Sequence, residues 1–167
     1  AQALQLSAEE SRLIQLVSQY RQSRGLSPVV PYPNLMSEAR WYAVDMARND
    51  AFSVTHVDSL GRTIDQRFWD FGYPFPMALG QATSSGGITP EETFEQLRTS
   101  PMHDAIMRDN RFRLAGAGYA RNEATDSKHF WVISFAKYRI PTKKPRTSAR
   151  KASRTAKSRR AKAAGRR

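Results

Sequence analysis

The stretch FSVTHVDSLGRTIDQRFWDFG, from Phe52 to Gly72, organises this chain together with SPMHD, from Ser100 to Asp104. Each segment contributes one of only three histidines, His56 and His103. Both segments join a turn to an expected helix, because Thr63 is a good N-cap for residues 64–71 and the Ser-Pro pair of the second segment starts another helix. A side chain at such a junction can face a cleft, so we predict that the two histidines mark the functional site.

Further helices are expected on either side of this stretch. Apolar residues recur at helical spacing after the capping-box residues Ser7 and Glu10, and Gly25 stands where that helix should stop. A second helix is predicted from about Leu35 to Asn49, and Thr89-Pro90 begins a later one. The segment 73–87 is rich in Pro and Gly without a sustained period, so we expect it to be a loop.

The C-terminal part of the folded region has the period of a β-hairpin. Residues 114–120 and 129–136 alternate with period two and flank a polar loop, which predicts two antiparallel strands. Glycine is frequent in the first strand and aromatic residues are frequent in the second. We therefore expect the large side chains of the second strand to lie over the glycines of the first.

The positive charge of the chain is concentrated at its C-terminal end. The net charge is +12, and residues 139–167 hold 13 of the 27 Lys and Arg with no Asp or Glu. Residues 1–138 therefore carry 14 basic and 15 acidic residues and are close to neutral. The last segment lacks the apolar residues that would offset the entropy of ordering. We predict one domain, residues 7–138, followed by a disordered basic tail, residues 139–167.

Composition excludes several classes of protein. The chain has no cysteine, which excludes disulfides, thiolate catalysis and Cys-ligated zinc. It has no run of about 18 apolar residues that would span a membrane. The polar opening AQALQLS, beginning at Ala1, fits a mature protein whose signal peptide was removed, so we expect a secreted or cell-surface location.

Five segments in this order resemble the CAP superfamily of cysteine-rich secretory, antigen-five and pathogenesis-related proteins, in its cysteine-free bacterial branch. They are QYRQSRGLSPV (19–29), ARWYAVDMARNDAFS (39–53), THVDSLGRTIDQRFWDFGY (55–73), SPMHDAIMRDNRFRLAGAGYA (100–120) and HFWVISFA (129–136). The resemblance implies an α+β fold, a single α/β/α sandwich in which helices flank a small antiparallel sheet.

The resemblance also implies a cleft lined by two histidines and one or two carboxylates, which in some members binds a divalent ion such as zinc. His56 and His103 match the two histidines, but Gln81 stands in the place of the usual glutamate. An amide keeps neither the charge nor the basicity of a carboxylate. Two imidazoles alone make a poor zinc site, and Asp58 or Asp104 are the nearest replacements in sequence. The alternative is that the histidines only hold two turns together.

An enzyme is the less favoured interpretation. No nucleophile elbow or protease signature is present, although a divalent-metal-dependent hydrolase that uses His56 and His103 stays open as an alternative. The third histidine, His129, is interpreted as a surface or hairpin-pairing residue. The aromatic set between Trp69 and Met77 is expected to form core and cleft wall. Its second interpretation, suggested by lipid-binding relatives, is a groove for a small apolar ligand.

The basic tail is expected to bind a polyanion by counterion release. The cell wall, lipopolysaccharide, anionic lipid and nucleic acid are all candidate partners, and sequence-specific reading is not expected because no aromatic residue follows Tyr138. The predicted contacts are Lys143, Lys144, Arg146, Arg150, Lys151, Arg154, Lys157, Arg159, Arg160, Lys162, Arg166 and Arg167. The sequence thus predicts a binding module with a histidine-lined cleft, tethered by its tail; the alternatives are a non-specific nucleic-acid binder and a tail that only solubilises the domain.

Overall fold

The computed structural model describes residues 5–52, 54–75 and 78–138. The predicted tail, with all of its predicted contacts, lies outside these residues, as does Met77. The helices are α1 (Ala8–Ser23), α2 (Pro33–Asn49), α3 (Ile64–Asp70), α4 (Pro90–Thr99) and α5 (Pro101–Met107). The capping boxes at Ser7 and Thr63 are both formed. The α2 helix begins two residues earlier than expected because a proline is favourable in the first turn.

The sheet has four strands, β1 (Val30–Pro31), β2 (Leu79–Ser85), β3 (Leu114–Arg121) and β4 (His129–Ala136), in the order β1-β3-β4-β2. The predicted hairpin is formed by β3 and β4. The very short β1 pairs with β3 in parallel, so the sheet is mixed rather than purely antiparallel. The prediction of a loop over 73–87 was wrong in part, because β2 pairs with β4 along its whole length. Its sequence LGQATSS lacks the apolar alternation that signals a strand.

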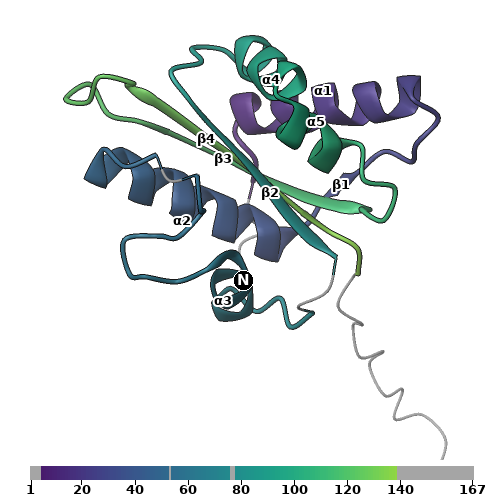
Figure 1. The fold of residues 1–167 in the computed structure, drawn as a ribbon, viewed down its shortest axis with the longest axis horizontal. Helices are drawn as coiled ribbons and strands as arrows, with labels where there is room; N and C mark the ends of the chain where they lie inside the picture. Colours follow the sequence, from purple (N-terminus) through teal and green to yellow (C-terminus); the bar gives the residue numbers. More distant parts are fainter. Residues whose placement is uncertain (1–4, 53, 76–77, 139–167) are drawn as a thin grey trace, which may run out of the picture.

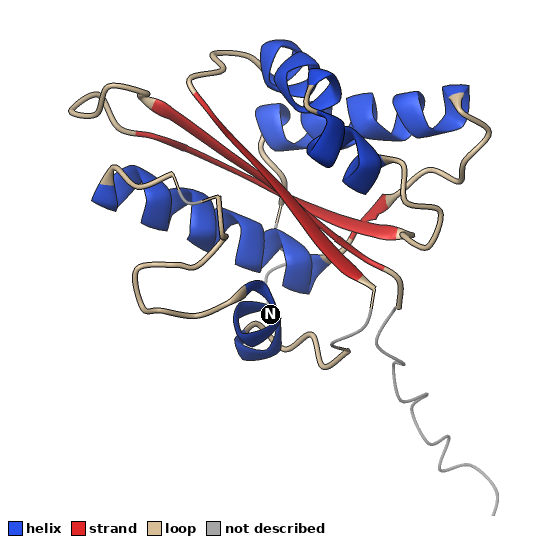
Figure 2. Cartoon of the chain, viewed as in Figure 1, coloured by secondary structure: helices blue, strands red, loops and turns tan. Residues whose placement is uncertain are grey.

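The helices cover both faces of the sheet, which confirms the predicted α/β/α sandwich. In Figure 1, α1, α4 and α5 lie on one face and α2 and α3 lie on the other. Figure 2 shows the same layers by secondary structure, with the strands between two groups of helices. No helix in the described ranges is long and apolar enough to cross a membrane.

The glycines of β3 allow α2 to approach the sheet closely. A Cβ placed on Gly116 would lie 2.1 Å from the carbonyl carbon of Leu35, and one on Gly118 would lie 2.2 Å from that of Ala39. Helix backbone therefore covers these glycines, and the expectation that aromatic side chains of β4 would do so was wrong. Because the backbone of α2 packs so closely against the sheet, the side chains on its inner face contact the neighbouring strands directly.

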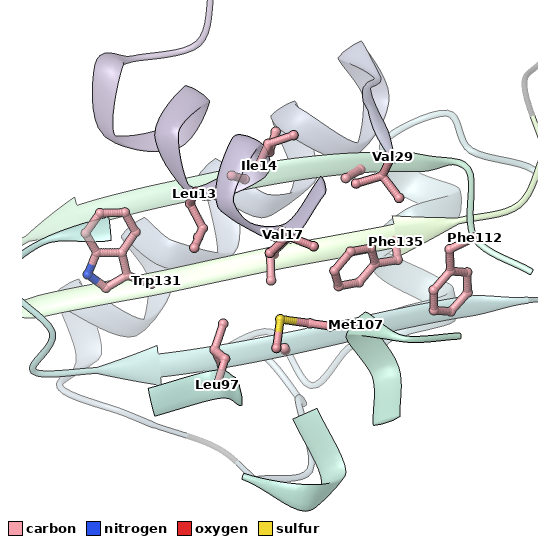
Figure 3. Close-up of a cluster of buried hydrophobic side chains, with 13 residues drawn as sticks. Leu13, Ile14, Val17, Val29, Leu97, Met107, Phe112, Trp131 and Phe135 are labelled. Atoms are coloured by element: carbon pink, nitrogen blue, oxygen red, sulfur yellow. The ribbon is translucent and has the colours of Figure 1, made fainter. Parts of the chain in front are cut away.

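The larger core lies between the sheet and the layer of α1, α4 and α5. Figure 3 shows its main side chains, which come from both helical and strand segments. They include Leu13, Ile14 and Val17 of α1, Leu97 of α4, Met107 of α5, and Trp131 and Phe135 of β4. On the opposite face, Ala39, Tyr42 and Ala43 of α2 pack against β4. A polar cluster interrupts the apolar packing on that second face, close to β2.

Candidate functional site

A cavity of about 440 Å³ lies beside the edge strand β2, between the segment that precedes α3 and the helix α5. Figure 1 shows α3 and α5 on opposite faces of the sheet, with β2 between them. Most of the cavity wall is apolar, and it comes from Val54, Ile64, Leu79, Met102, Ile106 and Phe112. His56 and Gln81 contribute polar side chains to the same wall. The cavity is large enough to hold a small organic molecule.

The turn before α3 is built by two aspartates. The carboxylate of Asp58 accepts hydrogen bonds from the backbone N–H groups of Leu60 and Arg62, at 3.0 and 2.9 Å. Asp45 of α2 accepts from the backbone N–H and the hydroxyl of Ser59, so this serine is held within the turn. These contacts fix the backbone that carries His56, whose φ of 56° lies in the left-handed region. Histidine is among the residues that tolerate this region best.

A buried ion pair lies beneath the histidine. The guanidinium of Arg67, in α3, donates from Nε to Glu38 Oε1, in α2, at 2.6 Å, and both side chains are fully buried. Arg67 also donates from Nη1 to the backbone carbonyl of His56 at 3.1 Å, and its guanidinium stacks over the Tyr42 ring at 3.8 Å. Burial raises the pKa of Tyr42 to about 12. One arginine therefore joins α2, α3 and the histidine turn.

Gln81 connects this ion pair to His56. Its Nε2 donates to Glu38 Oε1 at 2.9 Å and to Ser134 Oγ at 2.8 Å, and Ser134 donates in turn to Glu38 Oε2 at 2.5 Å. Its Oε1 accepts from Arg67 Nη2 at 2.8 Å and lies 3.1 Å from His56 Nδ1. Burial raises the pKa of the Glu38 carboxyl, and the three groups that donate to it counter this effect. The amide thus replaces the expected glutamate beside a carboxylate from another element.

The two histidines share one electrostatic environment. Burial lowers the pKa of His56; the hydrogen bond with Gln81 opposes this effect, while the charges of His103 and Arg67 add to it. Burial also lowers the pKa of His103, which lies in α5 next to Met102 of the cavity wall. Of the predicted cleft residues, His56 and Gln81 line the cavity. His103 and Asp58 are not part of its wall, but His103 is near enough for its charge to act on His56. Both imidazoles favour the neutral form at pH 7.

The two aspartates proposed as replacement ligands are already engaged. Asp58 binds the turn and pairs with Arg62 at 2.8 Å, and its carboxylate lies 3.7 Å from Arg67 Nη1. Asp104 accepts from the hydroxyl of Tyr20 at 2.5 Å and pairs with Arg108 at 2.7 Å. Both carboxylates therefore neutralise arginines or complete local hydrogen bonds, and each would have to leave these partners to bind a ligand in the cavity.

The donor set does not fit a metal site. In the described ranges, no group of three or more His, Asp or Glu side chains is arranged to hold an ion. The Gln81 oxygen that faces His56 also accepts from Arg67, so a cation there would lie against a guanidinium. Stable zinc sites use three or four ligands without such a competing charge. Metal binding by His56 and His103 stays a prediction, which titration with zinc tests.

Three residues of this cluster escaped sequence reasoning, although each left a signal. Glu38 lies three residues after Leu35 and four before Tyr42, on the apolar face of α2. Arg67 precedes the buried Phe68 in a short helix, and Ser134 interrupts the apolar strand β4. A charge on an apolar face and a hydroxyl in an apolar strand both predict buried polar partners.

The remaining predicted residues lie away from the cavity. His129 accepts or donates a hydrogen bond with the Tyr119 hydroxyl at 2.8 Å and stacks on its ring, which fits a pairing role in the hairpin. Trp69 is 64% exposed, whereas Tyr73 is buried in a cluster with Phe68. Neither Trp69 nor Tyr73 lines the cavity wall.

Comparison with known proteins gives a consistent result. The family model for the cysteine-rich secretory protein family, CAP, matches residues 14–135. No curated protein sequence matches the chain. Among solved structures, an outer surface protein from Borrelia burgdorferi has a TM-score of 0.67 and 19% identity over 77% of this chain and 92% of its own. An extracellular protein with an SCP domain from Bacillus anthracis has a TM-score of 0.68 and 17% identity over 78% of this chain and 40% of its own. Venom allergen-like protein 4 from Schistosoma mansoni has a TM-score of 0.58 and 14% identity, over 78% of this chain and 89% of its own.

Proposed function

Because this chain belongs to the CAP family of cysteine-rich secretory proteins, we propose that it is a non-catalytic binding module that works outside the cell. Its domain binds a small, mostly apolar ligand in the histidine-lined cavity, and its tail, residues 139–167, attaches the domain to an anionic polymer. Relatives of the same fold include an outer surface protein and an extracellular protein, which supports the proposed location.

The state of the carboxylates near the histidines carries the binding proposal. With only two histidines, a metal site needs at least one further ligand, and a histidine that acts as a general base is commonly oriented by a carboxylate. Here Glu38 accepts from Arg67, Gln81 and Ser134, and Asp58 pairs with Arg62. The cavity wall is mostly apolar beside these satisfied groups. Such a site favours the retention of an apolar molecule over the chemistry of a hydrolase.

Calorimetric titration tests the domain's part of the proposal. The full chain is titrated with zinc and assayed for turnover of peptide and ester substrates, beside the His56→Ala variant. We expect no heat at micromolar zinc and no turnover by either protein. Zinc binding or turnover that is present in the wild type and lost in His56→Ala would establish the metal-dependent hydrolase instead.

The tail's part rests on its charge, 13 Lys and Arg with no Asp or Glu. Binding to heparin, lipopolysaccharide, anionic vesicles and DNA is measured for the full chain and for a chain that ends at Tyr138. We expect affinity to fall steeply as salt rises, because counterion release drives the binding, and to vanish in the shorter chain. Affinity that survives the truncation would refute the assignment to the tail. A strong preference for DNA would favour the nucleic-acid alternative.

A further inference from the structure

The orientation of the Gln81 amide is determined by its two charged neighbours. An arginine can only donate hydrogen bonds, and a carboxylate can only accept them. The atom that faces Arg67 Nη2 at 2.8 Å is therefore the amide oxygen, and the atom that faces Glu38 Oε1 at 2.9 Å is the amide nitrogen. The contacts of Ser134 agree with this orientation, since its hydroxyl oxygen accepts from the amide nitrogen and its O–H donates to Glu38.

This orientation determines which nitrogen of His56 carries the proton. Nδ1 lies 3.1 Å from the oxygen of Gln81, which offers only lone pairs, so Nδ1 must donate. In the neutral ring the other nitrogen, Nε2, then holds a lone pair and accepts hydrogen bonds. The Arg67 guanidinium, which binds the backbone carbonyl of the same residue, opposes a second proton on the ring. Glu38, Arg67 and Gln81 thus act as positioning residues for His56.

Nε2 of His56 is an uncharged hydrogen-bond acceptor on the cavity wall that the described residues leave unused. Gln81, which also lines the cavity, uses both ends of its amide within the buried cluster. Asp109 and Arg111, which also line the cavity, form an ion pair with each other at 2.5 Å. No hydrogen bond to Nε2 is formed within the described part of the chain, and His56 lines the cavity. A ligand therefore meets mostly apolar walls, the neutral acceptor Nε2 of His56, and the paired charges of Asp109 and Arg111.

From this arrangement we infer that the cavity selects an apolar molecule bearing a hydroxyl group, an aliphatic alcohol, which donates its O–H to Nε2 of His56. A carboxylate of the same chain length presents only acceptors, so it cannot donate to Nε2, and its charge would have to compete with Asp109 for Arg111. The inference rests on the proposed binding function and specifies the chemistry of its ligand. It concerns the cavity alone and is independent of the tail.

The tautomer is tested first, in the wild-type full chain, so that no variant has to fold. Long-range ¹H–¹⁵N correlation spectra of the imidazole rings at pH 7.5 distinguish a proton on Nδ1 from one on Nε2. We expect the Nδ1–H form for His56. The Nε2–H form, or an even mixture of both, would overturn the inference.

Ligand selection is tested with 1-octanol, monooctanoylglycerol and octanoate as probes, by the same spectra and by calorimetry. We expect at least one of the two hydroxyl probes to bind ten times more tightly than octanoate, and the better of the two identifies a free or a lipid-borne alcohol. Equal binding, tighter binding of octanoate, or no binding of either hydroxyl probe would overturn the inference. The tail's affinity for polyanions, measured separately, would stand in each of these cases.

A pair of variants links the selectivity to one ring. His56→Asn removes the acceptor while keeping a residue that tolerates the left-handed backbone, and it should cost the hydroxyl probe at least ten-fold in affinity. The matched control is His129→Asn, since that histidine pairs with Tyr119 in the hairpin. This variant should bind the hydroxyl probe with the affinity of the wild type. Unchanged hydroxyl binding in His56→Asn would overturn the inference.

Discussion

Replacing Gln81 by the glutamate usual in the family should destabilise this protein. The amide nitrogen that donates to Glu38 at 2.9 Å would become a carboxylate oxygen facing a carboxylate. At that separation two unit charges repel by about 6 kcal/mol for an effective dielectric constant of 20. Taking up one proton at pH 7 costs about 4 kcal/mol for a group with an ordinary glutamate pKa. Protonation is the cheaper outcome, so we expect Gln81→Glu to lower the free energy of unfolding by about 4 kcal/mol at most.

The proton uptake makes this loss depend on pH in a definite direction. The pKa of the new carboxyl pair lies above its value in the unfolded chain, so the folded state binds more protons than the unfolded state between the two values. Stability of the variant should therefore rise as the pH falls from 7 toward about 4.5, by up to about 1.4 kcal/mol per pH unit more than that of the wild type. Urea denaturation followed by circular dichroism at pH 7, 6 and 5 measures it.

The matched variants are Glu38→Gln and the exchange Glu38→Gln/Gln81→Glu. The first removes the carboxylate that pairs with the buried Arg67 at 2.6 Å and, among the described residues, leaves only Asp58, 3.7 Å away, so it should cost about 3–5 kcal/mol. The exchange restores one carboxylate and one amide around Arg67, so most of both losses should be recovered. The single variants should bind no zinc at micromolar concentration, because the guanidinium stays in place. Additive losses in the exchange, or a Gln81→Glu variant as stable as the wild type at pH 7, would refute the argument.

Three further outcomes are expected from the same denaturation assay. Arg21 is fully buried and donates to four backbone carbonyls, so Arg21→Met should lower the free energy of unfolding by about 3–5 kcal/mol. The control Arg111→Met removes an exposed ion pair and should lower it by less than about 1 kcal/mol. Gly116→Ala should lower the free energy of unfolding by about 3 kcal/mol or more, since the new Cβ would clash with helix backbone. Gly25→Ala should lower it by only about 1–2 kcal/mol, because the site has open space and only the φ of 73° is unfavourable. Wild-type stability should fall as the pH drops from 7 to 5, because the pKa of His56 is lowered in the folded state and the unfolded chain therefore binds more protons. The variant His56→Asn should show a smaller change of stability with pH. An unchanged pH dependence in this variant would contradict the role of His56.

Local patterns predicted the helices and the hairpin well. The capping boxes at Ser7 and Thr63 and the period of two in residues 114–120 and 129–136 act between near neighbours, so they can be recognised from sequence. The strand β2 was missed because its residues are small and polar, and its burial comes from the layers that cover it. A strand buried on both faces needs no alternation of its own.

The sequence alone was enough to indicate that this chain folds as a CAP domain and that Gln81 stands in place of the expected carboxylate. The tertiary structure then showed that the carboxylate of Glu38, from the helix α2, lies beside Gln81. Glu38 lies 43 positions away in the chain, and the close approach of α2 to the glycines of β3 is what brings it to the edge strand. The spacing of residues along a chain predicts contacts within one helix or strand. Which donors and acceptors face each other in a buried hydrogen-bond network depends on which helices and strands pack together.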